Sequence, residues 1–203
     1  DEVITGIANL IESRDGSTGL HVKNTQNYVQ ILTKALREKG MYPHILDHNY
    51  ELNTVKASVL HDIGKIKTPD AILLKPGRLT DEEFEVMKQH TVAGCEIIDR
   101  IIGNVEHEEY VDIARKIARY HHERWDGTGY PDGLSGEEIP LCARIMALAD
   151  VFDALYQDRC YKKAIRPASK VFEIIKENSG SQFDPNLTEI FLELQREITD
   201  ISE

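Results

Sequence analysis

Apolar residues recur at helical spacing along nearly the whole chain, and runs that alternate apolar and polar residues are scarce. Side chains three and four positions apart share one face of a helix, so this spacing favours helices that each bury one face. The sequence therefore predicts an all-α bundle of about seven to eight helices. With 203 residues, 41% of them hydrophobic, the chain can bury one sizeable core. We expect one domain over residues 1–203.

Capping and breaking residues set the expected helix boundaries. Thr80 and Glu83 form a capping box, Gly40 and Gly103 suit helix ends, and Pro140 suits a first turn. The expected helices cover about 4–13, 17 or 18 to 40, 47–63, 80–103, 107–122 and 140–156, with others starting at 167 and 185. The first helix, within residues 1–13, would either pack on the domain or continue a linker from an upstream domain.

Two long stretches, 65–79 and 123–139, lack helical spacing and are rich in glycine and proline. Loops of this length inside a compact domain are usually functional. We therefore expect both to border an active site.

Charge and cysteine content exclude several classes of protein. The net charge of -11 argues against a nucleic-acid polymer or an anionic membrane as the main partner. No apolar run reaches the roughly 20 residues of a membrane span, and no signal-peptide pattern is present. Cys95, Cys142 and Cys160 lie far apart without a CxxC pair, so we expect reduced thiols in the cytoplasm. The start at Asp1 instead of Met suggests a piece of a longer protein.

Five of the eight histidines stand close to other ligand-type groups: His21, His61, His90, His121 and His122. For each of them alone a structural role is favoured over a ligand role, and their joint occurrence changes that preference. The remaining three are expected at the surface: His44, His48 and His107.

Two aspartates stand where a carboxylate without a partner would be costly. Asp62 follows His61 at the end of an apolar segment, and Asp150 lies within MALADVFDAL. A metal ion would compensate either charge, although Asp150 could equally cap a backbone or pair with Arg144. Asp153, three residues later on the same face, would orient a liganding imidazole.

Five imidazoles and two carboxylates exceed the needs of one tetrahedral site and suffice for two metal ions. Two divalent ions about 3.5 to 4 Å apart can activate water and stabilise a phosphoryl displacement. Mixed imidazole and carboxylate ligands suit iron or manganese, with zinc, nickel or cobalt as alternatives. Lys65 would aim an ammonium at a phosphate oxygen, although an ordinary solvent lysine also fits. Gly94, four residues after His90, would allow another backbone or a ligand to approach closely.

Six ordered blocks carry a family resemblance: RDGSTGLH (14–21), HDIGKI (61–66), LLKPGRLTDEEFEVMKQH (73–90), HHERWDGTGYPDGLSGEEIP (121–140), ARIMALADVFDAL (143–155) and FDP (183–185). Together they resemble the HD-GYP domain, a bacterial branch of the HD metal-dependent phosphohydrolases that hydrolyses cyclic di-GMP. The resemblance covers nearly the whole chain. It implies an HD-domain-like helical bundle with two long active-site loops.

The resemblance also implies a role for each matching position. One metal would be held by His21, His61, Asp62 and Asp150, and a second by Asp62, His90, His121 and His122. Lys65 would contact the scissile phosphate, and Tyr130 of the GYP tripeptide would lie near the substrate. Arg159 and Lys162 match basic positions that contact the dinucleotide, although two solvated cations would fit there equally well.

Two details sharpen this expectation. Neighbouring side chains on a helix point about 100° apart, so we expect the helix to lose its regular geometry near His121 and His122, or the two rings to reach one ion from different sides. Some family members have a glutamate four residues before the first histidine, where it supports a third metal, and this chain has Ser17. Serine is too short to reach from that face, so we predict two metals and not three, with Ser17 capping the helix.

The implied reaction is attack on a phosphodiester by a hydroxide that bridges the metals, giving pGpG and, in a second round, GMP. Three alternatives stay open: an HD-GYP phosphodiesterase for cyclic GMP-AMP or linear pGpG, a catalytically silent domain that binds a cyclic dinucleotide or a partner protein, and a bundle with structural histidines. All seven expected ligand positions are filled, which favours the enzyme. An upstream receiver or sensor domain and a homodimer are the macromolecular partners considered.

Overall fold

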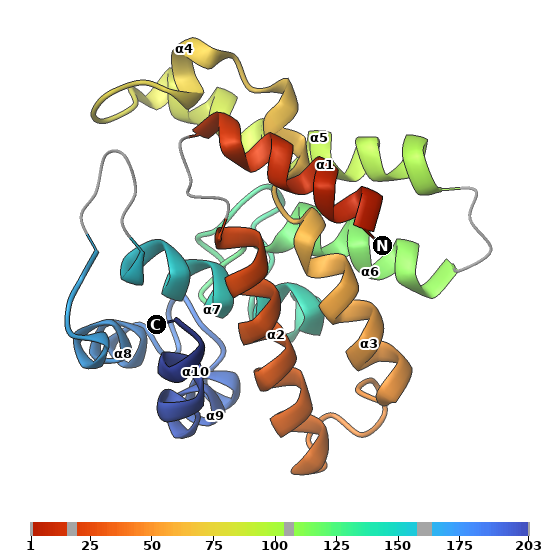
Figure 1. The fold of residues 1–203 in the computed structure, drawn as a ribbon, viewed down its shortest axis with the longest axis vertical. Coiled ribbons are helices and arrows are strands. Elements are labelled where there is room, and N and C mark those ends of the chain that lie inside the picture. Colours follow the sequence, from red (N-terminus) through yellow and green to blue (C-terminus); the bar gives the residue numbers. More distant parts are fainter. Residues whose placement is uncertain (1, 16–19, 104–107, 158–163, 203) are drawn as a thin grey trace.

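The computed structural model describes residues 2–15, 20–103, 108–157 and 164–202, and these ranges contain helices and no β-strand. The α-helices are α1 (Glu2–Glu12), α2 (His21–Glu38), α3 (His48–Ala57), α4 (Asp70–Leu73), α5 (Asp81–Ile102), α6 (Glu108–Tyr120), α7 (Leu141–Tyr156), α8 (Ala168–Glu177), α9 (Pro185–Glu193) and α10 (Gln195–Ser202). Short 3₁₀ helices are η1 (Ser13–Asp15), η2 (Ser58–Leu60), η3 (Ile63–Lys67) and η4 (Gly136–Glu138). The all-α expectation is confirmed (Figure 1).

Two expected helices differ from the structure. The helix expected over 47–63 ends at Ala57, because the chain tightens into η2 and η3 around His61 and Asp62. The helix expected from 17 or 18 begins at His21 in the part of the chain that the structure describes, and residues 16–19 lie outside that part. The short helices α4 and α10 were not expected.

One hydrophobic core joins the helices from Ala8 to Ile198. Helices α2, α3, α6 and α7 gather around its centre, while α8, α9 and α10 close one end (Figure 1). Tyr28 and Phe152 are fully buried there. Helix α1 packs on this core through Ala8 and Ile11, so within the described residues it is part of the packed body.

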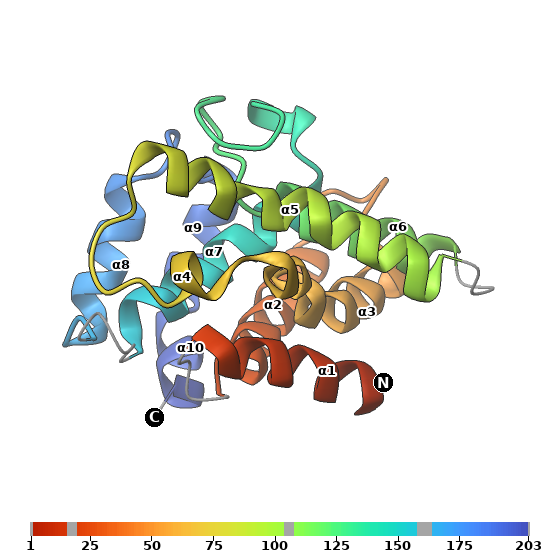
Figure 2. The ribbon, with the colours of Figure 1, turned by 90° about the horizontal axis from the view of Figure 1, so that it is seen from above.

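Beside the site, the backbone of η3 lies directly against the backbone of α5. A Cβ on Gly64 would lie 1.8 Å from the carbonyl oxygen of His90 and 2.5 Å from the amide nitrogen of Gly94. Glycine at 64 and 94 thus allows the two backbones to touch, as expected for Gly94. Helices α5 and α6 run side by side across the same face (Figure 2).

No helix in the described ranges combines the length and the apolar character needed to cross a membrane. Cys95 and Cys142 are free thiols, and Cys160 lies outside the described residues.

Candidate metal centre

Seven predicted side chains converge from five parts of the fold: His21 of α2, His61 and Asp62 between η2 and η3, His90 of α5, His121 and His122 after α6, and Asp150 of α7. All are buried except His122 and Asp150, which are half-buried. By contrast, His44 and His48 are exposed, as expected, and His107 lies outside the described residues.

The first half of the cluster surrounds His21 and His61. Their Nε2 atoms lie 3.4 Å apart. Asp150 Oδ1 is 3.5 Å from Nε2 of His21 and 4.0 Å from Nε2 of His61, and Asp62 Oδ2 is 3.3 Å from Nε2 of His61. An oxygen of Asp62 and an oxygen of Asp150 each therefore lie within 4.0 Å of an imidazole nitrogen of this pair.

The second half lies on the other side of Asp62. Asp62 Oδ1 is 3.2 Å from Nε2 of His90 and 3.6 Å from Nε2 of His121. Donor atoms of these three residues and of His122 all lie within 4.8 Å of one another. The two oxygens of Asp62 thus face different halves, as a bridging carboxylate would.

His121 and His122 stand in a turn after α6, which ends at Tyr120. The helix was expected to reach His122 and ends two residues earlier, so the expected loss of regular geometry near the pair is confirmed. The two ring centroids are 4.0 Å apart. Both rings therefore reach the same half of the cluster.

Hydrogen bonds orient four of the imidazoles. Nδ1 donates to a backbone carbonyl in His61 (2.8 Å to Ser58), His90 (2.7 Å to Met87) and His121 (2.9 Å to Ile117). In His21, Nδ1 lies 2.6 Å from the Asp153 carboxylate. A proton on Nδ1 leaves the Nε2 lone pair of a neutral ring directed into the cluster, which is the arrangement that metal ligands use.

Among the buried polar atoms of the described residues that make no hydrogen bond, three belong to these donors: Asp62 Oδ1, His90 Nε2 and His121 Nε2. Buried polar atoms without hydrogen bonds are costly. A cation between these donors would remove this cost. The residues therefore fit divalent metal ions.

The pKa shifts differ between the two halves of the cluster. Burial lowers the pKa of His61, but the Asp62 carboxylate outweighs burial and raises it to about 9. Burial raises the pKa of Asp62, yet Lys65 and His61 hold it well below its usual value. For His122, burial and the neighbouring histidines hold the pKa well below its usual value, so that ring stays neutral.

Lys65 borders the cluster and is not an ordinary surface lysine. Its Nζ lies 2.7 Å from Asp62 Oδ2, and only 12% of its side chain is exposed. The ammonium could therefore meet an anion that approaches the cluster. The alternative pairing of Asp150 with Arg144 is wrong, because Arg144 Nη1 donates to Asp184 at 2.6 Å.

The loop that carries the GYP tripeptide is fixed from inside by Glu123. This carboxylate accepts backbone N–H groups of Asp132, Gly133 and Leu134 at 2.8, 3.1 and 3.1 Å. A Cβ on Gly129 would lie 2.3 Å from the amide nitrogen of Arg124, so glycine is required there. The loop is therefore built to hold one shape.

Tyr130 covers the second half of the cluster. Its ring stacks on His122 with centroids 4.9 Å apart, and burial, reinforced by Asp62 and Asp150, raises the pKa of its hydroxyl. A pocket of 290 Å³ opens beside it, lined also by Phe84, Lys88, His121, His122 and Val151. Phe84 and Lys88 were missed in the sequence, where they fitted an ordinary helix face.

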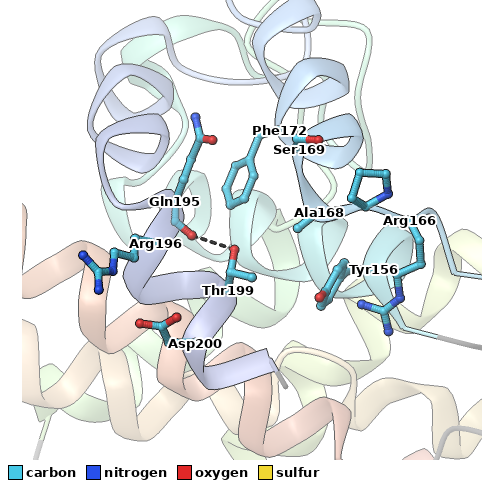
Figure 3. A pocket seen from close by; sticks show the side chains of 10 residues that line it. Tyr156, Arg166, Ala168, Ser169, Phe172, Gln195, Arg196, Thr199 and Asp200 are labelled. Carbon is cyan, nitrogen blue, oxygen red and sulfur yellow. Dashed lines mark hydrogen bonds between the residues drawn. The ribbon is translucent and has the colours of Figure 1, made fainter.

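A larger hollow of 910 Å³ lies elsewhere, between α8, α10 and the end of α7. Arg166 places its guanidinium 3.8 Å from the Tyr156 ring centre on one wall, and Arg196 and Asp200 stand across from them (Figure 3). None of the predicted site residues that the structure describes lines this hollow. Arg159, Lys162 and Ser17 lie outside the described residues.

Asp153 offers a test of how the cluster is oriented. Its carboxylate also accepts a hydrogen bond from Asn24 at 3.1 Å, and it is fully buried. Asp153→Asn is expected to lower metal affinity about 10- to 100-fold, because the neutral amide no longer holds His21 Nδ1–H as firmly. Competition with a chelator measures this affinity. Asp200→Asn, at an exposed position, is the matched control, and equal affinities in both variants would contradict this role.

Comparisons with known proteins agree with this geometry. A family model described as an HD domain matches residues 8–187. The chain is 45% identical over its whole length to a cyclic di-GMP phosphodiesterase of Vibrio cholerae and 38% identical over 95% of its length to a 3'3'-cGAMP-specific phosphodiesterase of the same organism. It spans 41% and 34% of those two proteins.

Among solved structures, an HDG"Y"P protein from Bdellovibrio bacteriovorus superposes with a TM-score of 0.58 at 18% identity, over 84% of this chain and 51% of that one. This likeness concerns the fold. The chain belongs to the HD domain family. With Gly129, Tyr130 and Pro131 following the histidine pair, it is a member of the HD-GYP branch, and its buried cluster indicates divalent metal binding.

Proposed function

We propose that this chain is a phosphodiesterase that hydrolyses cyclic di-GMP to pGpG, and then to GMP, with two divalent metal ions. The observation that carries the proposal is the direction of the imidazoles, because four rings are tied through Nδ1. The Nε2 atoms of His61, His90 and His121 lie 3.2 to 3.6 Å from the two oxygens of Asp62. Nε2 of His21 lies 3.4 Å from that of His61. A structural role would not leave so many buried acceptor atoms facing one another. The similarity to cyclic di-GMP phosphodiesterases supports the substrate.

His21, His61, Asp62 and Asp150 would hold one ion, and Asp62, His90, His121 and His122 the other. When bound, the ions supply Lewis acidity and lower the pKa of water. The Lys65 ammonium, held at Asp62, would neutralise charge on the phosphate. Tyr130 and the loop fixed by Glu123 would limit how the phosphodiester enters.

Iron or manganese is the proposed metal, because imidazole and carboxylate donors dominate and no thiol is among the donors of the described cluster. Zinc, nickel and cobalt are the alternatives. A cytoplasmic location, an upstream receiver or sensor domain and a homodimer stay predictions from the sequence.

Phe84 and Lys88 are proposed to contact the nucleotide. Phe84 is 43% exposed and lies edge-on to Tyr130 with centroids 5.9 Å apart, while Lys88 Nζ stands 5.0 Å from the Phe84 ring centre. An exposed ring on the wall of a pocket offers a face to a nucleobase, and the ammonium beside it offers a charge to a phosphate.

Phe84→Ala is expected to raise KM for cyclic di-GMP about tenfold with little change in kcat, because base stacking is lost and the reacting groups are untouched. Steady-state kinetics measure both constants. Phe84→Leu keeps the apolar bulk and should show a smaller but similar rise. An unchanged KM in Phe84→Ala would exclude contact with the base.

Two other substrates remain to be separated from cyclic di-GMP. The similarity to a 3'3'-cGAMP-specific phosphodiesterase favours cyclic GMP-AMP as the second candidate, and pGpG is the third. The test is turnover of all three by protein loaded anaerobically with iron or manganese, with products separated by chromatography. Cyclic di-GMP should be consumed fastest, and pGpG should accumulate first.

Matched histidine variants complete this experiment. His61→Ala removes a ring at the centre of the cluster, whereas His48→Ala removes one whose side chain is 68% exposed. Only the first should abolish turnover. Binding of cyclic di-GMP without turnover by the metal-loaded protein would instead establish the catalytically silent alternative.

A further inference from the structure

Glu12 is a buried carboxylate that the sequence did not indicate as part of the site. It is the last residue of α1 and is only 3% exposed. The preceding residue, Ile11, and Ala8 one turn earlier are buried in the core, so the end of α1 is held firmly in place. A carboxylate in such surroundings requires positive charge nearby.

The carboxylate of Glu12 reaches the first half of the metal centre. Donor atoms of Glu12, His21, His61 and Asp62 all lie within 4.8 Å of one another. Lys65 Nζ is 3.6 Å from Glu12 Oε1 and 2.7 Å from Asp62 Oδ2. One ammonium thus lies between the two carboxylates.

We propose that Glu12 is a ligand of the metal ion held by His21 and His61, so that helix α1 contributes directly to the metal centre. The proposal rests on the proposed function for the presence of that ion. The donor atom of Glu12 and those of His21, His61 and Asp62 are already gathered within the span that one ion's ligands occupy.

Helix α2 begins at His21, and Ser17 lies outside the described residues. The additional carboxylate at this half of the centre comes from another helix, α1.

Glu12 has a second conceivable role, which is to hold the Lys65 ammonium in place. The two roles make different predictions for Glu12→Gln. If Glu12 binds the metal, Glu12→Gln weakens metal binding, whereas Lys65→Met leaves it intact or tightens it. If Glu12 serves Lys65 alone, neither Glu12→Gln nor Lys65→Met changes metal binding.

The test measures metal ions per chain and Mn²⁺ affinity, by elemental analysis after dialysis at fixed free Mn²⁺ and by electron paramagnetic resonance of the free ion. The wild-type protein should hold about two ions. Glu12→Gln preserves side-chain volume. It should lower the affinity for the ion at His21 and His61 about 10- to 100-fold, leaving about one ion per chain. Lys65→Met and the exposed control Glu38→Gln should keep about two ions.

Each outcome has a distinct meaning. Glu12→Gln with wild-type stoichiometry and affinity would overturn the assignment of Glu12 while leaving the metal centre intact. A wild-type protein that binds no Mn²⁺ or Fe²⁺ would overturn the proposed function itself. Circular dichroism of Glu12→Gln verifies the fold, and Ile11→Val, a mild packing change in the same helix, should keep both ions.

Discussion

The Asp62→Ala variant is expected to lose at least about a thousandfold in kcat/KM for cyclic di-GMP. Asp62 is the one carboxylate of the described cluster that belongs to both groups of metal-binding donors. Its loss would weaken the binding of both ions. Metal ions stabilise such transition states by several kcal/mol, and each 1.36 kcal/mol or so of activation free energy is a factor of ten in rate. Steady-state turnover at saturating metal measures the loss.

The control is Asp99→Ala, which removes an exposed aspartate of α5 that pairs with Arg115. Turnover by this variant should match the wild type. If Asp62→Ala retained even a tenth of the wild-type activity, Asp62 could not be shared by two catalytic ions.

The second large effect concerns stability. Arg144 of α7 and Asp184 before α9 form a buried ion pair at 2.6 Å, and Asp184 also accepts the backbone N–H of Asn186 at 2.8 Å, which caps α9. Arg144→Met leaves the buried carboxylate without its guanidinium. The free energy of unfolding should fall by about 3–5 kcal/mol, measured by urea denaturation.

Two further variants test whether the loss of stability comes from the unpaired, buried charge of Asp184. Arg144→Met combined with Asp184→Asn removes both charges and should recover part of the lost stability. Lys39→Met breaks an exposed pair with Glu193, 2.7 Å apart, and should cost less than about 1 kcal/mol. Equal losses of unfolding free energy in Arg144→Met and Lys39→Met would show that the buried pair contributes no more to stability than an exposed pair.

Helix positions were predictable where the sequence carries explicit end signals. The capping box of Thr80 and Glu83 is present, with Glu83 accepting the Thr80 backbone N–H at 2.7 Å. The break after Ala57 was not predictable, because Val59 and Ile63 continue the apolar spacing whether the chain is an α-helix or tight 3₁₀ turns.

Some residues of the candidate site could also be predicted from the sequence, and others could not. Histidines and aspartates are ligand types, so their grouping could be inferred from spacing and from the family resemblance. Glu12 could not, since only the packing of α1 on the core brings it to His21. Phe84 resembled a core residue of an amphipathic helix, and its 43% exposure beside Tyr130 appears only in three dimensions.

The central claim is that the buried cluster holds two divalent ions that share Asp62. The most direct test is an anomalous diffraction map from crystals of the protein loaded anaerobically with manganese or iron. The map should contain two strong peaks about 3.5 to 4 Å apart, one beside His21 and His61 and the other beside His90 and His121, with Asp62 between them. A map with no peak, or with a single peak on one side of Asp62 at saturating metal, would contradict the claim.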